Sequence, residues 1–296
     1  MTTRRMFLKT LAGGALAAGA LGGYAFGIEP HYRLVETRYR VKSPRLDTLA
    51  LTNGRPLRVA ILTDLHACEP WMPVPRIEAI VRRTNALKPD LIVLLGDYVE
   101  SMRRFRTGIV PVKDWSAALG ALEAPHGVYA VLGNHDWWVD AQAITAHMEA
   151  AGITVLENRT VPITTPQGNR YWLAGLGDQL ARPNGHAWYD GVDDLDGTMR
   201  QIGDDESPVI LLAHEPDIFP DVPNRVDLTL CGHTHGGQVR LPIIGSPIVP
   251  SHYGQRYAYG HMIEDDRQLI VSGGLGCSML PVRFGMPPEI VVAELG

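Results

Sequence analysis

Five short polar clusters follow apolar runs along this chain, and they contain the residue types that hold metal ions. The clusters are Asp64-Leu65-His66, Gly96-Asp97-Tyr98, Gly133-Asn134-His135-Asp136, His214-Glu215-Pro216 and Gly232-His233-Thr234-His235-Gly236. A mixture of carboxylate, amide and imidazole ligands suits Zn, Mn or Fe better than Mg or Ca. None of the clusters contains a cysteine, which disfavours a closed structural zinc site. The set therefore predicts a transition-metal centre that leaves room for a substrate.

Each cluster has a simpler explanation when it is taken alone. An Asp at a strand end can cap the next helix, and a single His is more often a hydrogen-bonded structural residue. The spacing inside the clusters favours metal binding, because alternate residues of an extended segment, as at 64 and 66 or 233 and 235, face the same side. The two oxygens of Asp97 can bridge two cations. Two ions about 4 Å apart would hold a hydroxide between them and polarise a phosphoryl group for attack.

The apolar runs before these clusters have the length and composition of strands buried on both faces. They span 58–63, 91–95, 128–132, 209–213 and 226–231. Helical spacing of apolar residues at 74–87, 112–122 and 141–150 predicts helices in the same part of the chain. Strands that alternate with helices form parallel sheets, and the carboxyl ends of parallel strands meet at one crevice. We therefore expect the five clusters to converge.

Further strands are predicted at 153–155, 161–165, 170–174, 239–244, 257–263, 268–272 and 290–294, with a loop and a helix within 181–208. The predicted fold class is α/β, with two facing mixed β-sheets flanked by helices. One catalytic domain is expected over 58–296, after a lead-in segment at 28–57. Cys68, Cys231 and Cys277 are too few for a disulfide framework. Cys68 is interpreted as a packed residue in preference to a metal ligand.

The first 27 residues have the layout of an export signal. Arg4 and Arg5 precede an apolar pair and Lys9, and residues 11–27 are uncharged and rich in Ala, Gly and Leu. A buried first helix is the alternative, but the many glycines would destabilise it. The segment resembles a twin-arginine signal, which implies the twin-arginine export machinery as a partner and an exported, periplasmic or extracytoplasmic location. It is either removed or kept as an anchor in the cytoplasmic membrane.

The charge balance argues against nucleic-acid binding. The formal net charge is −5, and without the three basic residues of the leader the remainder carries 24 − 32 = −8. Affinity for a phosphate backbone comes from Lys and Arg, which this acidic body lacks in excess. A phosphorylated substrate would therefore need a local cationic site, and a pair of metal ions would supply it.

The five clusters, in this order and at these intervals, resemble the calcineurin-like metallophosphoesterase superfamily from about Arg58 onward. The resemblance implies two divalent transition-metal ions (Mn, Zn or Fe). It assigns Asp64, His66 and His235 to the first ion, Asn134, His214 and His233 to the second, and Asp97 to both. It also implies that His135 contacts the phosphoryl group and assists the leaving oxygen, and Asp136 is grouped with it as a catalytic candidate.

The chain departs from the family pattern after Asp97. Many members have an arginine in a GDxxDR motif, and this chain reads Gly96-Asp97-Tyr98-Val99-Glu100-Ser101. Glu100 would take the place of the aspartate that orients the catalytic histidine. Loss of the arginine argues against protein-phosphatase activity and suggests another way of holding phosphate.

The leader and the segments 63–66, 232–238, 274–276 and 280–284 resemble the bacterial branch that contains YkuE and YaeI. This implies a lipid-linked or cell-envelope substrate, such as a UDP-2,3-diacylglucosamine-like molecule, and contact with a membrane surface. An exported nucleotide phosphohydrolase and a non-catalytic metal-binding protein of the same fold are the alternatives. Residues near the clusters that could contact substrate or lipid are Trp137, Trp138, Arg103, Arg104, Arg106 and Arg283; ordinary packing or a solvated loop is the other explanation.

Overall fold

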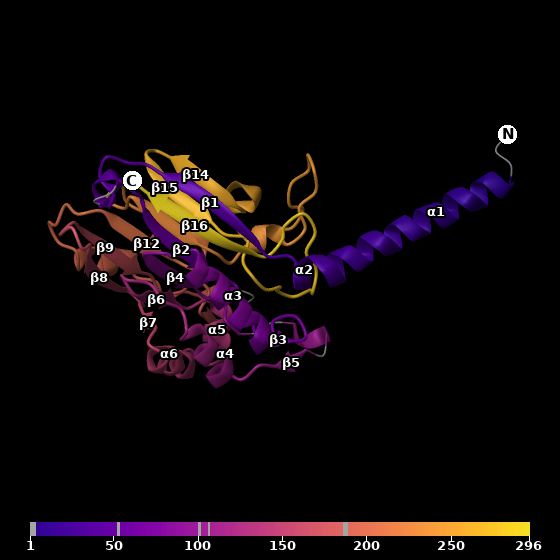
Figure 1. Cartoon of the computed structure of the whole chain (residues 1–296), viewed down its shortest axis with the longest axis horizontal. Coiled ribbons are helices and arrows are strands. Elements are labelled where there is room, and N and C mark those ends of the chain that lie inside the picture. The colour runs from indigo at the N-terminus through magenta and orange to yellow at the C-terminus, as the bar shows by residue number, and fades with distance from the viewer. Residues whose placement is uncertain (1–3, 52–53, 100–101, 106, 186–188) are drawn as a thin grey trace.

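Two six-stranded sheets face each other and form the body of the protein (Figure 1). The computed structural model describes residues 4–51, 54–99, 102–105, 107–185 and 189–296. Sheet order is β1-β16-β2-β4-β6-β7 in the first sheet and β14-β15-β13-β12-β9-β8 in the second. The predicted α/β class with two facing mixed sheets is confirmed.

The first sheet consists of β1 (Val35–Val41), β16 (Glu289–Leu295), β2 (Leu57–Leu62), β4 (Leu91–Leu95), β6 (Val128–Val131) and β7 (Thr154–Val155). Strands β2, β4, β6 and β7 are parallel, whereas β16 runs antiparallel to β2 and parallel to β1. Helices α3 (Val74–Ala86), α4 (Val112–Leu119) and α6 (Ala141–Ala150) lie between its parallel strands in the chain and pack on its outer face.

The second sheet consists of β14 (Gly260–Glu264), β15 (Arg267–Val271), β13 (Leu228–Cys231), β12 (Val209–Leu212), β9 (Arg170–Gly175) and β8 (Arg159–Thr164). Its four central strands are parallel, and β14 and β8 are antiparallel edge strands. The remaining short elements are α5 (Asn134–Val139), α7 (Leu195–Arg200), β3 (Cys68–Glu69), β5 (Gly108–Ile109), β10 (Arg182–Pro183), β11 (Tyr189–Asp190) and turns at 46–49, 103–105, 216–221, 235–237 and 254–257.

Alternate residues of each central strand fill two different cores. In β2, Val59 and Ile61 pack between the two sheets, whereas Ala60 and Leu62 pack against the helices. A third core lies between the second sheet and the segments 195–202 and 218–226. Because successive side chains of a strand point to opposite faces, a continuous apolar run is buried on both. This four-layer packing holds the strand ends, and thus the polar clusters, in place.

The strand predicted at 239–244 is wrong. The structure has only isolated bridges there, Val239 to Phe284 and Leu241 to Gly245. Pro242 lacks a backbone N–H for a ladder, and Ile243 has φ 70, which no strand residue adopts. The apolar run in this segment therefore forms an exposed loop in place of a strand.

The N-terminal segment is helical, and its end is tied to the body. Helix α1 (Arg4–Gly23) leads through the turn η1 (Tyr24–Ile28) into α2 (Glu29–Tyr32) and leaves the body (Figure 1). Residues Met6–Tyr32 are long and apolar enough to cross a membrane, by length and composition. The buried Glu29 carboxylate accepts the N–H groups of Gly285 and Met286. The lead-in strand β1 then joins the first sheet beside β16.

Candidate metal centre

The five polar clusters meet where the two sheets end. Asp64, Asp97 and Asn134 follow β2, β4 and β6 of the first sheet, and His214 and His233 follow β12 and β13 of the second. All of the predicted ligands except His233 are classed as buried, and His233 is partly buried. Their side chains form two groups whose polar atoms lie within 4.8 Å of one another.

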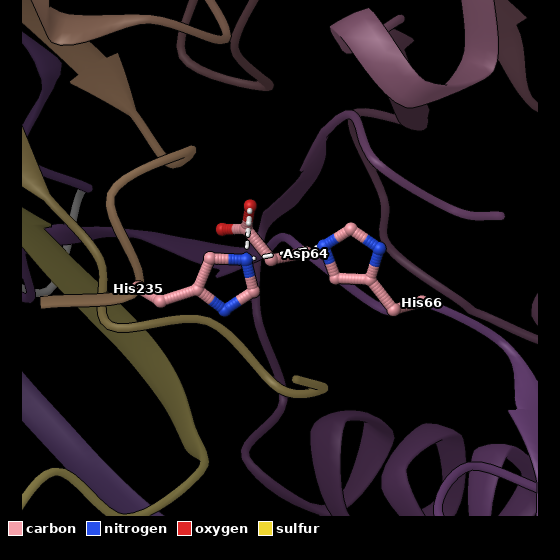
Figure 2. Close-up of side chains that lie close together, drawn as sticks. All are labelled: Asp64, His66 and His235. Carbon is pink, nitrogen blue, oxygen red and sulfur yellow. Dashed lines mark hydrogen bonds and ion pairs between the residues drawn. The ribbon is translucent and has the colours of Figure 1, made fainter. Parts of the chain in front are cut away.

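The first group is Asp64, His66 and His235, whose side chains point toward one another in Figure 2. His66 Nε2 lies 3.1 Å from His235 Nε2, and His235 Nε2 lies 3.4 Å from an Asp64 oxygen. His66 Nδ1 lies 2.8 Å from the Val99 carbonyl oxygen, which can only accept. The proton of His66 is therefore on Nδ1, and its Nε2 lone pair points into the group. Burial lowers the pKa of His66 to about 3, so the ring stays neutral, the form that binds a metal ion.

The second group is Asp97, His214 and His233, and Asn134 adjoins it. His214 Nδ1 donates to the Leu95 carbonyl oxygen at 2.6 Å, and its buried Nε2 lies 3.3 Å from Asp97 Oδ2. The Asn134 amide oxygen lies 3.1 Å from His233 Nδ1. A histidine that donates one nitrogen to a carbonyl and points the other at acceptor atoms has the arrangement found in metal sites.

Asp97 contacts both groups. Its Oδ2 lies 3.3 Å from His214 Nε2 and 3.5 Å from His66 Nε2. Burial acts to raise the pKa of Asp97, but the charges of His214 and His135 and a hydrogen bond outweigh it and hold that pKa well below the usual value. Burial likewise opposes the charging of His214, yet Asp97 and Glu215 raise its pKa well above the usual value. The pocket therefore attracts positive charge to the place where the two groups meet.

The backbone is strained at these positions. Left-handed φ values are uncommon for residues other than glycine. They occur here at Asp64 (53°), His66 (45°), Asp97 (57°), His233 (68°) and His235 (52°). A side chain at Gly133 would collide with Asp97, and one at Gly96 would collide with the Gly133 backbone. Such strain persists where the surrounding fold imposes it, and it gathers at functional sites.

His135 and Asp136 have different surroundings although they are adjacent. The His135 ring is partly exposed, with Nε2 3.9 Å from Asp97 Oδ2. The Asp136 carboxylate is buried and accepts the N–H groups of Asp97, Tyr98, Val99 and Gly133 at 2.8–3.3 Å. Asp136 therefore positions the loop that carries Asp97, whereas His135 faces the open side of the centre. Glu100, the third catalytic candidate, lies outside the described residues.

Two aromatic residues next to His135 differ in their contacts. The Trp138 ring lies 4.7 Å from the His135 ring and stacks on Tyr189 at 5.1 Å, with 37% of the residue exposed. Trp137 instead donates to Glu157 and packs on the core. Trp138 is thus the member of the pair at the mouth of the centre. Arg104 is exposed in the turn at 103–105, while Arg106 and the Arg103 side chain lie outside the described part of the chain.

Of three buried polar residues beside the centre, sequence reasoning missed Asp178, gave Glu215 no role and placed Arg283 near the clusters without a partner. Asp178 and Glu215 form a group with His214, and burial together with Glu215 raises the pKa of Asp178 to about 11. Asp178 lies just beyond β9, the neighbour of β12, so the rule that points to strand ends would have found it. Arg283 is fully buried, donates to the Gly276 and Met286 carbonyl oxygens and lies 3.3 Å from His235 Nδ1. The contact between Arg283 and His235 could not be predicted, because 48 residues separate them in the sequence.

Two facing mixed sheets with this centre at their strand ends define a class of α/β proteins with metal-binding chemistry. The chain belongs to the calcineurin-like phosphoesterase family, whose model matches residues 57–237. This family membership makes the chain a hydrolase of phosphoric esters. The metal-binding chemistry expected from the clusters agrees with the family and with the two groups of ligand atoms.

Relatives of similar length are known in bacteria. The chain is 33% identical to the uncharacterized metallophosphoesterase YkuE of Bacillus subtilis, over 99% of this chain and 97% of that protein. It is 31% identical to the phosphodiesterase YaeI of Escherichia coli over the full length of both. Among solved structures, a 5'-nucleotidase precursor from Thermus thermophilus has a TM-score of 0.49 and 13% identity, and the match covers 74% of this chain and 49% of that one.

Proposed function

We propose that this protein hydrolyses phosphodiester, phosphomonoester or pyrophosphate bonds with two divalent transition-metal ions (Mn, Zn or Fe). The observation that carries the proposal is the position of Asp97 Oδ2, within 3.5 Å of a histidine from each ligand group. Asp64, His66 and His235 would hold one ion, and Asn134, His214 and His233 the other. When bound, such ions activate water and neutralise charge on phosphoryl oxygens.

The chain's own residues would orient the substrate and move a proton. His135 is the partly exposed imidazole beside Asp97, and its Nε2 would donate to a phosphoryl oxygen and to the leaving oxygen. The backbone N–H of His135 donates to Asp97 Oδ1 at 2.9 Å, and this contact fixes the position of His135 relative to Asp97. Asp136 holds the loop that carries Asp97 in place by accepting hydrogen bonds from four backbone N–H groups. Glu100 is proposed to orient His135.

The leaving group would lie along Trp138 and Tyr189. Their stacked rings form an apolar surface next to His135, and such a surface suits an aromatic base, a sugar or an acyl chain. We favour a lipid-linked or cell-envelope substrate, such as a UDP-2,3-diacylglucosamine-like molecule, because an apolar helix adjoins the catalytic body. The name of the relative YaeI, a phosphodiesterase, supports the diester class.

An exported nucleotide phosphohydrolase is the second candidate, favoured by the same aromatic pair, on which a base could stack. His135 disfavours a non-catalytic metal-binding protein. It is proposed to act in catalysis and not to bind an ion, so a protein that only binds metal would have no use for it.

A substrate panel tests the proposal. The metal-supplemented protein would be given a phosphomonoester, a diester, a nucleotide, a nucleotide-sugar pyrophosphate and a diacylated pyrophosphate in detergent, and product release would be measured. We expect the diacylated substrate to have the highest kcat/KM. Preference for soluble nucleotides would favour the second candidate, and no turnover with any substrate would favour the non-catalytic one.

Export through the twin-arginine route is proposed for the N-terminal segment, with the helix kept as a membrane anchor or removed. Arg4 is exposed at the start of α1, and the helix has the length and composition to cross a membrane. An exported enzyme would not meet a cytoplasmic UDP-linked lipid. If the body lies outside the cytoplasm, the substrate would therefore be an envelope phospholipid or another envelope diester.

A further inference from the structure

Two uncharged loops lie at the base of the N-terminal helix. Residues 241–250 and 273–282 contain no Asp, Glu, Lys or Arg. Large apolar side chains stand exposed on them, at Ile243, Ile244, Ile248, Met279 and Leu280. Exposed loops are normally polar, and a contiguous exposed apolar surface marks a contact with a partner or a membrane. We call these five residues the apolar rim.

The tips of both loops carry residues that are unusual in exposed turns. Ile243 is fully exposed with φ 70, and Met279 is 76% exposed with φ 60. Glycine, asparagine and aspartate adopt this conformation at least cost, and a β-branched residue adopts it rarely. Both positions therefore combine an unfavourable backbone with an unfavourable exposure to water. A contact made by these side chains would offset the two costs.

Hydrogen bonds and ring contacts place the rim beside the helix base. The Arg283 N–H donates to the Ala25 carbonyl oxygen at 3.0 Å, and the Tyr24 and Phe284 rings are 6.2 Å apart. Gln238, which precedes the first loop, donates to the carbonyl oxygens of Ser278 and Leu280 in the second loop. Figure 1 shows the corresponding orange and yellow loops on the side of the body from which α1 leaves. Phe26 and Ile28, in the same short segment as Tyr24 and Ala25, are exposed apolar residues too.

Two cationic side chains line a cavity beside the first loop. A cavity of about 750 Å³ between the helix base and the first loop is lined by Tyr24, Arg33, Arg240, Ile243 and Phe284, among others. Arg33 and Arg240 are both exposed, and Arg33 donates to the Tyr24 hydroxyl at 2.8 Å. Exposed apolar side chains beside exposed arginines are the pattern of a surface that enters the interface of a bilayer with anionic lipids.

We propose that the apolar rim is a membrane-docking surface, and that its occupant is the headgroup and upper acyl region of the bilayer that the N-terminal helix enters. Proximity supports this occupant, because the helix base is hydrogen-bonded to residues 283–286, directly after the second loop, and lines a cavity with Ile243 of the first. A helix that spans the bilayer must bring Ile243, Ile248 and Met279 to its surface. This docking would set the orientation of the catalytic body at the bilayer, whatever the substrate is.

Docking through the apolar rim would orient the catalytic body, with the same face always turned toward the lipid. Arg283 touches the helix base through its backbone and His235 through its guanidinium. Arg283 therefore contacts both the helix base and the first ligand group. The metal centre would lie just behind the lipid headgroups.

Site-specific fluorescence tests the orientation. Full-length protein with Ile243→Cys or Ile248→Cys would carry an environment-sensitive dye and be reconstituted into vesicles of phosphatidylcholine and phosphatidylglycerol with a spin-labelled quencher lipid. The three native cysteines are buried and will not compete for the dye under native conditions. Ile263→Cys is the matched control, because Ile263 is 64% exposed but lies on β14, away from the loops.

We expect blue-shifted emission and quenching by the labelled lipid at 243 and 248, and neither at 263. Equal weak responses at all three positions would overturn the proposal. Equal strong quenching would also overturn it, because it would indicate adsorption without a preferred face. A blue shift at 243 without quenching would overturn it as well, by showing that protein, in place of lipid, covers the rim.

Discussion

Asp97 is the proposed bridge between the two ligand groups, because one of its carboxylate oxygens lies within 3.5 Å of a histidine of each. Asp97→Asn replaces one of two charged oxygens with an amide NH₂, which cannot bind a cation. We therefore expect the variant to lose both metal ions, as measured by elemental analysis of protein purified without chelator and then supplemented. Asp64→Asn is the matched comparison, since Asp64 belongs to the first group alone. Loss of one ion in both variants would contradict the bridging role.

His135 should affect turnover without affecting metal content. Its ring lies at the open side of the centre, and general acid help of this kind is worth roughly 10²–10⁴-fold in rate. We expect His135→Ala to lower kcat by about that factor while two ions remain bound. Parallel measurements of rate and metal content check this. Loss of an ion would make His135 a ligand, and unchanged turnover would remove it from the mechanism.

The convergence of the candidate ligands could be predicted from sequence, whereas the contacts of Asp136, Asp178 and Arg283 could not. A ligand position follows from a strand end, which apolar runs reveal. The contacts of Asp136 with the N–H groups of the Asp97 loop, and of Arg283 with His235, join segments 38 and 48 residues apart. Only the path of the folded chain brings such groups together.

At the scale of elements, continuous apolar runs predicted the buried strands because both faces of β2, β4 and β12 pack into cores. The same criterion failed at 239–244. There the apolar residues have no sheet to join, and Pro242 and the left-handed Ile243 prevent pairing. An apolar run indicates that a side chain leaves water, but it does not distinguish a protein core from another apolar surrounding.

The N-terminal helix gives a prediction about location. Arg4→Lys with Arg5→Lys should retain the protein in the cytoplasm, because the twin-arginine machinery recognises the arginine pair while a general signal needs only positive charge. Fractionation of cells that express the wild-type and the double variant is the measurement. Unchanged export of the variant, or export in cells without that machinery, would leave a general secretory signal or an uncleaved anchor.

At the scale of the whole molecule, the metal ions would join the two sheets. The first group takes Asp64 and His66 from the first sheet and His235 from the second, and the other group is divided in the same way. Chelation should therefore lower the melting temperature, and added Mn²⁺ or Zn²⁺ should restore it. An ion present at 100 times its Kd stabilises the folded state by about 2.7 kcal/mol.

The control for this experiment is the Asp97→Asn variant, whose melting temperature should not change with chelator or with added metal. A wild-type protein whose thermal transition is the same with and without chelator would show that the ions do not link the sheets. Differential scanning calorimetry at fixed protein concentration provides both comparisons.

The pairing of β1 with β16 sets an order of assembly. Val35 is opposite Glu289, so the strand that follows the N-terminal helix finds its neighbour 254 residues later. Contacts between distant segments form late, because a long stretch of chain must first be brought together. The helix base can be fixed only after Gly285 and Met286 have been made, because their N–H groups donate to the Glu29 carboxylate. While the ribosome is still making the protein, the N-terminal helix therefore remains undocked and accessible to other factors, and it becomes fixed to the body only after β16 has emerged.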